Sequence, residues 1–217
     1  MNKIKSYAVI GLGGFGSNVA LALMEEGMEV MVLDSSREKV NAIAPQVTYA
    51  MQLDASNEIA LKSVGIERMD GVVIAIGENL EASVMATILC KEMGVKKVIV
   101  KAETDLQKAI LTRVGADEVI LPEKESGYRL AKNIAGNFRD FFSISENLCI
   151  VEVPAKGEWI GKTIKELNFR KEYHLNIISI KSTSEEEADN FPNPDRHIRK
   201  DDMLIVAGKE EDIEKFL

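Results

Sequence analysis

A glycine-rich segment near the N-terminus has the residue spacing of a phosphate-binding turn. It reads Gly11-Leu12-Gly13-Gly14-Phe15-Gly16, directly after the apolar run Ser6–Ile10 and before a helix-length amphipathic stretch. In this context Gly11 permits a tight turn, Gly13 lets the backbone approach a phosphate, and Gly16 lets the helix pack closely on the strand. Backbone N–H groups and the helix dipole at such a junction favour a diphosphate.

An acidic residue follows at the distance expected for a sugar contact. Asp34 stands 18 residues after Gly16, at the end of a second apolar run, Glu29–Asp34. A carboxylate there can accept hydrogen bonds from both hydroxyls of an adenosine ribose, and it would repel a 2′-phosphate. The alternative is that the glycines serve packing alone and that Asp34 only caps the helix start at Ser35 and Ser36.

A parallel sheet is needed to bring these residues together. Between Lys5 and Leu121 an apolar strand followed by a helical stretch recurs six times, which predicts an α/β fold with a Rossmann-like, doubly wound parallel six-stranded sheet. Glycines that favour a left-handed helix end mark the predicted helix stops at Gly27, Gly65, Gly94 and Gly115. The predicted strands are Ser6–Ile10, Glu29–Asp34, Val47–Leu53, Gly71–Ile76, Lys97–Lys101 and Glu118–Leu121.

The same topology predicts further binding residues, because ligands in open α/β sheets bind beyond the carboxyl ends of the strands. For two of these candidates the sequence leaves an alternative to ligand binding. Asp54 could instead cap the helix ahead of Ser56, and Lys101 could instead pair with a surface carboxylate. The candidates at these strand ends are Ser35, Asp54, Ala55, Ile76, Gly77, Glu78, Asn79 and Lys101.

A smaller α+β domain is predicted to follow the sheet, giving domains over 1–142 and 143–217. A helix over about 124–142 joins them. Its apolar stripe could pack on the sheet of its own domain or cross to another subunit, and the sequence favours neither role over the other. The acidic run Glu185–Asp189 is predicted to be a solvated loop. The apolar stripe of the helix comprises Leu130, Ile134, Phe138 and Phe141, and the second domain has strands near Leu148–Val153, Asn176–Lys181 and Met203–Val206 and helices near Thr163–Leu167 and Glu210–Phe216.

Composition argues against several classes of protein. A net charge of −8 over 217 residues argues against a dedicated nucleic-acid binder. No apolar run reaches membrane-spanning length and the N-terminus lacks a secretory pattern, so a soluble intracellular protein is expected. Cys90 and Cys149 are too few and too far apart for a disulfide framework or a metal knuckle.

Catalytic equipment is not evident in the sequence. His174 and His197 are the only histidines, and neither lies in a recognisable acid–base setting. Neither a nucleophile elbow nor a catalytic triad spacing is present. We therefore predict no catalytic residues and a nucleotide that is bound without being consumed, with an NAD-dependent oxidoreductase of unknown substrate as the alternative.

Three stretches together resemble a known family. They are Tyr7–Gly16, Val73–Gly77 and Gly115–Lys124. The sequence resembles the regulator of potassium conductance family, the RCK or KTN domains of Trk- and Ktr-type potassium uptake, over essentially the whole chain, since Leu148–Leu217 is similar to the C-terminal RCK domain. The resemblance implies a cytosolic regulatory subunit that senses a nucleotide in the Rossmann cleft and thereby controls ring conformation and ion flux.

The resemblance also implies partners and cofactors. Homodimers would pair through the crossing helix, assemble as an octameric ring and dock on a potassium channel subunit at the inner face of the membrane. The nucleotide would be ATP or ADP, with AMP, NAD or NADH as alternatives. Glu123 matches a glutamate that helps bind a divalent cation, Mg²⁺ or Ca²⁺, beside ATP phosphates. Gly14 departs from the family pattern, because an arginine that contacts phosphate is common there.

A second ligand is implied for the C-terminal domain. Some Ktr relatives bind cyclic di-AMP at a dimer interface of this domain, and five residues here match that pocket. The alternative is that the aliphatic and proline positions are ordinary core and loop residues. Glu172 would also place a negative charge near the ligand. The five matching residues are Ile164, Arg170, Asn176, Ile177 and Pro192.

Overall fold

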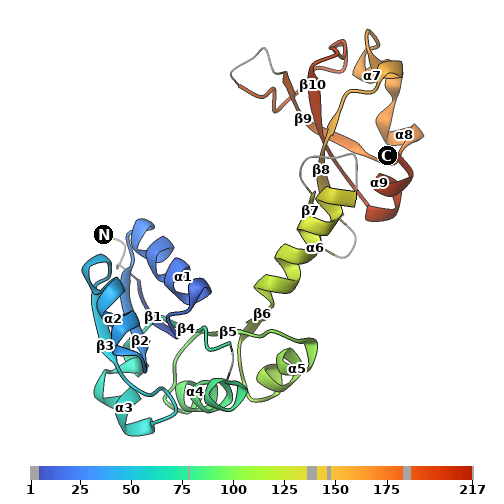
Figure 1. Ribbon diagram of the computed structural model, residues 1–217. Helices are drawn as coiled ribbons and strands as arrows, with labels where there is room; N and C mark the ends of the chain where they lie inside the picture. Colours follow the sequence, from blue (N-terminus) through green and yellow to red (C-terminus); the bar gives the residue numbers. More distant parts are fainter. Residues whose placement is uncertain (1–4, 78, 136–140, 146–147, 183–186, 217) are drawn as a thin grey trace. The chain divides into compact units, whose positions relative to one another are not determined.

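The chain folds into two compact units, which Figure 1 shows with their helices and strands. The structure, a computed structural model, describes residues 5–77, 79–135, 141–145, 148–182 and 187–216. One unit comprises Met1–Lys124 and the other Glu125–Leu217. Each has its own sheet and its own hydrophobic core.

Six parallel strands form the sheet of the N-terminal unit, in the order β3-β2-β1-β4-β5-β6. The chain winds outward in one direction from β1 and then in the other from β4, so the switch point of a doubly wound sheet lies between these two strands. The predicted fold class is confirmed. The strands are β1 Ser6–Ile10, β2 Glu29–Asp34, β3 Tyr49–Gln52, β4 Gly71–Ile74, β5 Val98–Lys101 and β6 Glu118–Ile120.

Helices cover both faces of this sheet because successive strand residues point to opposite sides. Ile10 packs in a core cluster with residues of α3, α4 and α5, whereas its neighbour Val9 packs with α1 and α2. The helices are α1 Gly14–Glu25, α2 Arg37–Ile43, α3 Glu58–Ser63, α4 Leu80–Glu92 and α5 Asp105–Arg113, with 3₁₀ turns at Ala44–Gln46 and Ile66–Arg68.

The glycines predicted to end helices have left-handed backbone conformations. Gly27, Gly65, Gly94 and Gly115 all have positive φ angles, between 70° and 109°. A residue with a Cβ atom is disfavoured in this conformation, so these glycines close the helices and turn the chain toward the next strand.

The C-terminal unit is a four-stranded antiparallel sheet with short helices, in the order β7-β8-β10-β9. Its core surrounds Trp159, whose ring packs edge-on against Phe169. The predicted α+β class is confirmed. The elements are α6 Pro122–Ala135, β7 Phe141–Ser145, β8 Leu148–Pro154, a 3₁₀ turn at Gly157–Trp159, α7 Ile164–Leu167, α8 Phe169–Glu172, β9 Asn176–Ser182, β10 Asp202–Gly208 and α9 Glu210–Phe216.

The prediction that the long helix continues to residue 142 is wrong. Phe141 and Phe142 form β7, where Phe141 pairs with Val151 of β8 and is buried. Phe138 lies outside the described residues.

The acidic run predicted as a solvated loop is also partly wrong. Asp189 forms a bridge with Ile180 and an ion pair with Arg196 at 3.0 Å, so its end of the run is tied to the sheet. Residues 185 and 186 of that run lie outside the described part of the chain.

From Glu125 onward helix α6 belongs to the C-terminal unit by its contacts, whereas the sequence assigned the segment up to residue 142 to the first domain. The Tyr128 hydroxyl donates a hydrogen bond of 2.6 Å to Glu210 of α9, and Lys132 binds both Glu210 and Glu214, the latter at 2.7 Å. The Lys132 ammonium also lies 5.8 Å from the centre of the Phe141 ring. These contacts join α6 to the C-terminal helix, and we call them the α6–α9 latch.

Replacing Lys132 with Met is expected to lower the free energy of unfolding of the C-terminal unit by about 1 kcal/mol at neutral pH, because the pairs are only partly buried. The hydrogen bond from Lys132 holds the pKa of Glu210 below its ordinary value. The stabilisation is therefore complete above that ordinary value and is lost as the pH falls through the lowered one.

Urea unfolding followed by the fluorescence of Trp159, the single tryptophan, measures this effect at pH 7 and at about pH 3. The matched control is Lys62→Met, which removes an exposed ion pair with Glu58 in the other unit. It should leave the Trp159 transition unchanged. An equal loss of stability from Lys132→Met at both pH values would contradict the role given to the latch.

Candidate nucleotide-binding site

A cavity of about 580 Å³ lies where five strands of the parallel sheet end. Its walls come from the segments that follow β1 to β5, so it crosses the switch point between β1 and β4. The lining residues are Ile10 to Phe15 after β1, Leu33 to Ser35 and Lys39 after β2, Leu53 to Ser56 after β3, Ala75 to Gly77, Asn79 and Ala82 after β4, and Lys101 and Glu103 after β5.

The glycines of the first turn have different physical roles. Gly11 has a φ of +94°, and a Cβ atom there would lie 2.9 Å from the backbone of Ala75. A Cβ atom on Gly16 would lie 1.9 Å from the Gly11 carbonyl oxygen. Gly13 and Gly14 have nothing within 4 Å of the added carbon. Gly11 and Gly16 therefore let the turn pack against the segment that follows β4, and Gly13 and Gly14 leave its backbone open.

Gly16 itself is not among the cavity-lining residues, because it is buried beneath the turn. Helix α1 begins at Gly14, its N-cap Gly13 provides no side-chain cap, and its first turn contains no acidic residue. The first amides of a helix have no partner within the helix. Gly13, Gly14 and Phe15, at the start of this helix, line the cavity. Free amides and the positive end of a helix dipole at such a place suit an anion such as a phosphate.

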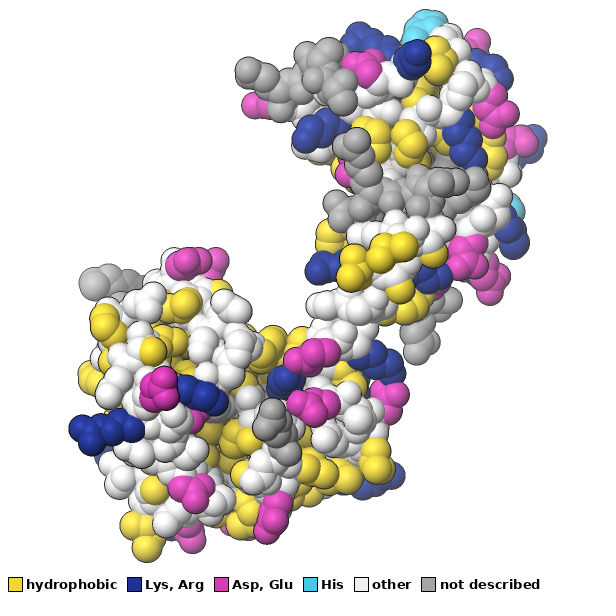
Figure 2. All heavy atoms as spheres, in the orientation of Figure 1, with side chains coloured by type: hydrophobic (Ala, Val, Ile, Leu, Met, Phe, Trp, Pro, Cys, Tyr) yellow, Lys and Arg dark blue, Asp and Glu magenta, His cyan; other side chains and the backbone are white. Residues whose placement is uncertain are grey.

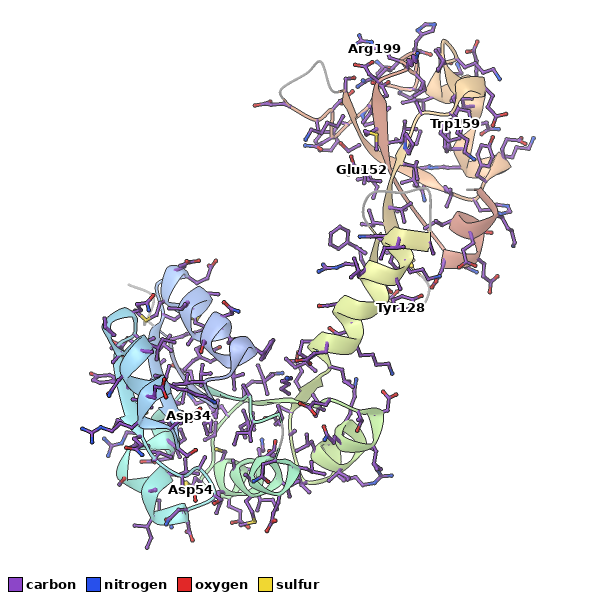
Figure 3. All side chains as sticks on the ribbon, viewed as in Figure 1. Asp34, Asp54, Tyr128, Glu152, Trp159 and Arg199 are labelled. Atoms are coloured by element: carbon purple, nitrogen blue, oxygen red, sulfur yellow. The ribbon has the colours of Figure 1, made fainter. Side chains whose placement is uncertain are left out.

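Asp34 joins the end of β2 to the glycine turn. The residue is 9% exposed, and its carboxylate accepts two backbone hydrogen bonds, from Leu12 at 2.6 Å and from Ser36 at 2.7 Å. Each bond uses a different oxygen, so each oxygen keeps one lone pair for a ligand. The N-cap of α2 is Ser36, so Asp34 is not the cap of that helix, and its bond from Leu12 ties it to the glycine turn. Figure 3 labels Asp34 and Asp54 in the N-terminal unit.

On the β5 side of the cavity, Lys101 takes part in an ion pair. Its side chain is 11% exposed, and its ammonium lies 2.5 Å from the Glu123 carboxylate and 4.0 Å from that of Glu103. The hydrogen bond from Lys101 holds the pKa of Glu123 below its ordinary value. Lys101 therefore lines the cavity, as predicted for a binding residue, and it also pairs with a carboxylate, as the alternative to ligand binding predicted.

Glu123 stands outside the cavity lining. Among the described residues no group of three or more metal-binding side chains forms. A divalent cation at Glu123 would need phosphate oxygens as further ligands and would compete with Lys101, so metal binding there stays a prediction. Glu78 lies outside the described residues.

At the end of β3, Asp54 accepts hydrogen bonds from the Ser56 amide at 2.9 Å and the Ser56 hydroxyl at 2.7 Å. Helix α3 has Asn57 as its N-cap, so the alternative of helix capping by Asp54 is wrong. Asp54 instead fixes the turn that precedes the helix. Ala55 is buried beside it and lines the cavity, as Ile76 and Asn79 do on the other side.

Three polar lining residues were missed from the sequence. Ser56 directly follows the predicted Ala55, and Glu103 stands two residues beyond the predicted Lys101, so a longer window at each strand end would have found them. Lys39 lies in the first turn of α2, and its position depends on the direction of that helix.

The five residues predicted for a second ligand all lie in the C-terminal unit. Ile164 opens α7 and Ile177 lies in β9, and both are half-buried against the core. Arg170 in α8 and Asn176 in β9 are exposed, and Pro192 is half-buried in the segment before β10. The aliphatic pair thus has a packing role, and ligand binding by the five residues stays a prediction.

Comparison with known proteins agrees with this division of the chain. Residues 7–122 match the TrkA-N domain, and residues 148–217 match the TrkA-C domain. The chain belongs to the TrkA domain family. The resemblance inferred from the sequence is thereby confirmed.

Named relatives of this family cover the chain almost end to end. The Ktr system potassium uptake protein C of Bacillus subtilis (strain 168) is 39% identical over 98% of this chain and 96% of its own length. The Ktr system potassium uptake protein A of the same organism is 36% identical over 99% and 96%.

A solved structure, the GsuK channel bound to NAD, has the same fold. Its TM-score is 0.67 at 15% sequence identity, with 97% of this chain and 38% of that chain covered. The present chain thus spans well under half of that channel protein. Within the described part of this chain, no helix is both long enough and apolar enough to cross a membrane.

Proposed function

We propose that the chain is a regulatory subunit of a Ktr- or Trk-type potassium uptake system that binds an adenine nucleotide in the cavity of its N-terminal unit. One observation carries the proposal: a glycine turn with open amides and a buried carboxylate with two free lone pairs meet in one cavity. Relatives named as Ktr potassium uptake proteins, similar over nearly the whole chain, support the regulatory role.

The dimensions and chemistry of the cavity favour an adenosine diphosphate moiety. The phosphates would rest on the amides at Gly13 and Gly14, and the ribose hydroxyls would donate to Asp34. Lys101 and Asn79, on the side of the cavity that follows β4 and β5, would contact the part of the ligand attached to the diphosphate. ATP and ADP are favoured, because Lys101 supplies a cation for a further phosphate. NAD, NADH and AMP are the alternatives.

A second copy of the chain is the proposed partner of α6. Leu130 and Ile134 on this helix are 59% and 76% exposed, and Figure 2 shows hydrophobic side chains gathered over it. Burying them in a homodimer would remove this surface from water. We further propose that dimers form an octameric ring on the cytosolic side of a membrane potassium channel subunit, which would make the protein peripheral to the inner face of the membrane. We expect no nucleic-acid partner.

The alternative function, an NAD-dependent oxidoreductase, lacks support from the cavity. Such an enzyme needs a proton donor beside the nicotinamide. The titratable groups of the lining are Asp34, Lys39, Asp54, Lys101 and Glu103, and all of them except Lys39 take part in hydrogen bonds or ion pairs that the structure describes. We propose that no residue here is catalytic and that the nucleotide shifts a conformational equilibrium.

A native mass spectrometry experiment tests the proposal. Purified protein is measured alone and with ATP, ADP, AMP or NAD, and the expected result is a nucleotide-bound oligomer whose size or subunit arrangement depends on the ligand. Absorbance of NADH in the presence of small carbonyl compounds should stay constant. An oligomer insensitive to every adenine nucleotide would contradict the proposal, and NADH oxidation would favour the enzyme.

A further inference from the structure

We infer that a second copy of the chain docks on one face of the C-terminal sheet, through reciprocal ion pairs between Glu152 of each copy and Lys181 of the other. The inference rests on the homodimer of the proposed function and goes beyond it, since that proposal places the second copy at α6 alone. It assigns an interface to β8, β9 and β10.

The two faces of this sheet have different surroundings. Figure 1 shows α7, α8 and α9 on one side of the strands, and Leu167, Phe169 and Ile213 from these helices form a core with Val151 and Val153 of β8. Alternate strand residues point to the opposite side. We call that side the outer face. It comprises Phe142, Ile150, Glu152, Lys181, Met203 and Ile205, and none of these six belongs to the described core.

The outer face is mainly apolar and partly open to solvent. Phe142 is 48% exposed, and Ile150 and Ile205 are half-buried. At its β7 edge the face meets α6, where the Arg129 guanidinium lies 5.7 Å from the centre of the Phe142 ring. The outer face is therefore continuous with the helix whose exposed apolar side chains are proposed to bind a second copy, and the same occupant would cover both.

Two charged side chains stand on this face without partners. Glu152 is half-buried and pairs with Ile205 in the register of β8 and β10, while Lys181 pairs with Met203 in the register of β9 and β10. Within the part of the chain that the structure describes, neither side chain makes an ion pair or a hydrogen bond. A charged group on an apolar surface is covered at little cost only when its partner supplies the opposite charge.

The positions of the two charges make the outer face complementary to itself. Glu152 and Lys181 lie on opposite sides of β10, the strand between β8 and β9. In a pair related by a two-fold axis, a contact of one residue with another is repeated with the two copies exchanged. One arrangement therefore joins Glu152 to Lys181 twice and covers Ile205 and Met203 between the two pairs. Partial exclusion of water strengthens both attractions.

Exchanging the charges tests this arrangement. Glu152→Lys and Lys181→Glu each place like charges at both contacts, so each variant alone should raise the dissociation constant of self-association at least about tenfold. An equimolar mixture of the two variants joins opposite charges at both contacts and should associate about as wild type does. Sedimentation equilibrium of the full chain, without nucleotide, measures these constants. The matched control is Lys165→Glu on α7, which should stay within about twofold of wild type.

The mixture also allows a direct test of proximity. Glu152 is then present only on one variant and Lys181 only on the other, so a carbodiimide crosslink between them must join two chains. We expect mass spectrometry of the digested mixture to find this crosslink. Its absence, or a mixture that associates no better than the single variants, would overturn the inference.

Two further outcomes separate the inference from the homodimer on which it rests. Unchanged dissociation constants in both single variants would overturn the inference and leave the homodimer at α6 intact. A wild-type chain that stays monomeric at every concentration would overturn both.

Discussion

Replacing Asp34 with Ala is expected to weaken the binding of ADP by at least about 100-fold. The variant loses two charge-assisted hydrogen bonds to the ribose, each contributing about 1.5–3 kcal/mol, and every 1.4 kcal/mol is a factor of ten in affinity. It also removes the acceptor of the Leu12 amide, which now fixes the glycine turn at 2.6 Å from the carboxylate. The loss of the ribose contact and the loosening of the glycine turn both weaken the binding of ADP.

Isothermal titration calorimetry with ADP measures this loss, and Asp70→Ala is the matched control. Asp70 also accepts a hydrogen bond from a β1 amide, that of Ser6 at 3.1 Å, but at the opposite end of the strand and outside the cavity lining. Its variant should bind ADP within about twofold of wild type, a difference of less than 0.5 kcal/mol. Equal affinity of wild type and Asp34→Ala would show that the carboxylate does not hold the ribose.

Gly16→Ala is expected to destabilise the N-terminal unit by about 3 kcal/mol and to impair nucleotide binding. The new methyl group would lie 1.9 Å from the Gly11 carbonyl oxygen, so the backbone of either the turn or α1 must move. Gly11 lines the cavity, and its displacement would carry the phosphate-binding amides with it.

Gly14→Ala provides the comparison for Gly16→Ala. Nothing lies within 4 Å of the carbon it adds, and alanine is favoured over glycine in a helix, so the change in stability should stay within about 1 kcal/mol. Urea unfolding is followed by far-ultraviolet circular dichroism, with the C-terminal unit monitored separately through Trp159. If the two alanine variants unfold at the same urea concentration, the packing role of Gly16 is wrong.

Much of the parallel sheet was predictable because its strands are short apolar runs with clear ends. The bounds of β1 and β2 agree with the predicted ones. The fourth strand was predicted to reach Ile76, but it ends at Ile74. The Ala75 amide still donates to the Ile10 carbonyl at 2.7 Å, and Ala75 and Ile76 line the cavity. The edge strand β3 is shorter than predicted, since it has a neighbour on one side only.

The end of helix α6 was less predictable because distant contacts decide it. An apolar pattern continues through Phe141 and Phe142, and it fits a helix as well as a strand. The pairing with β8 and the α6–α9 latch, which joins Tyr128 to a residue 82 positions away, resolve that ambiguity. Neither contact has a local signal in the sequence.

In the candidate site too, some residues could be predicted from the sequence and others could not. Residues at strand ends, such as Asp34 and Lys101, follow from topology and were expected to line one cavity. Lys39 depends on the orientation of α2, and the pairing of Glu123 with Lys101 depends on where α6 begins. These positions required the three-dimensional arrangement.

The central claim is that an adenosine diphosphate moiety binds at the junction of β1 and α1. Mass spectrometry of the small molecules that wild type and Asp34→Ala release on denaturation, after both have been incubated with ATP, ADP, AMP and NAD and desalted, tests it most directly. We expect an adenine nucleotide from wild type, close to one per chain, and little or none from the variant. Release of no nucleotide from wild type, or of equal amounts from both proteins, would contradict the claim.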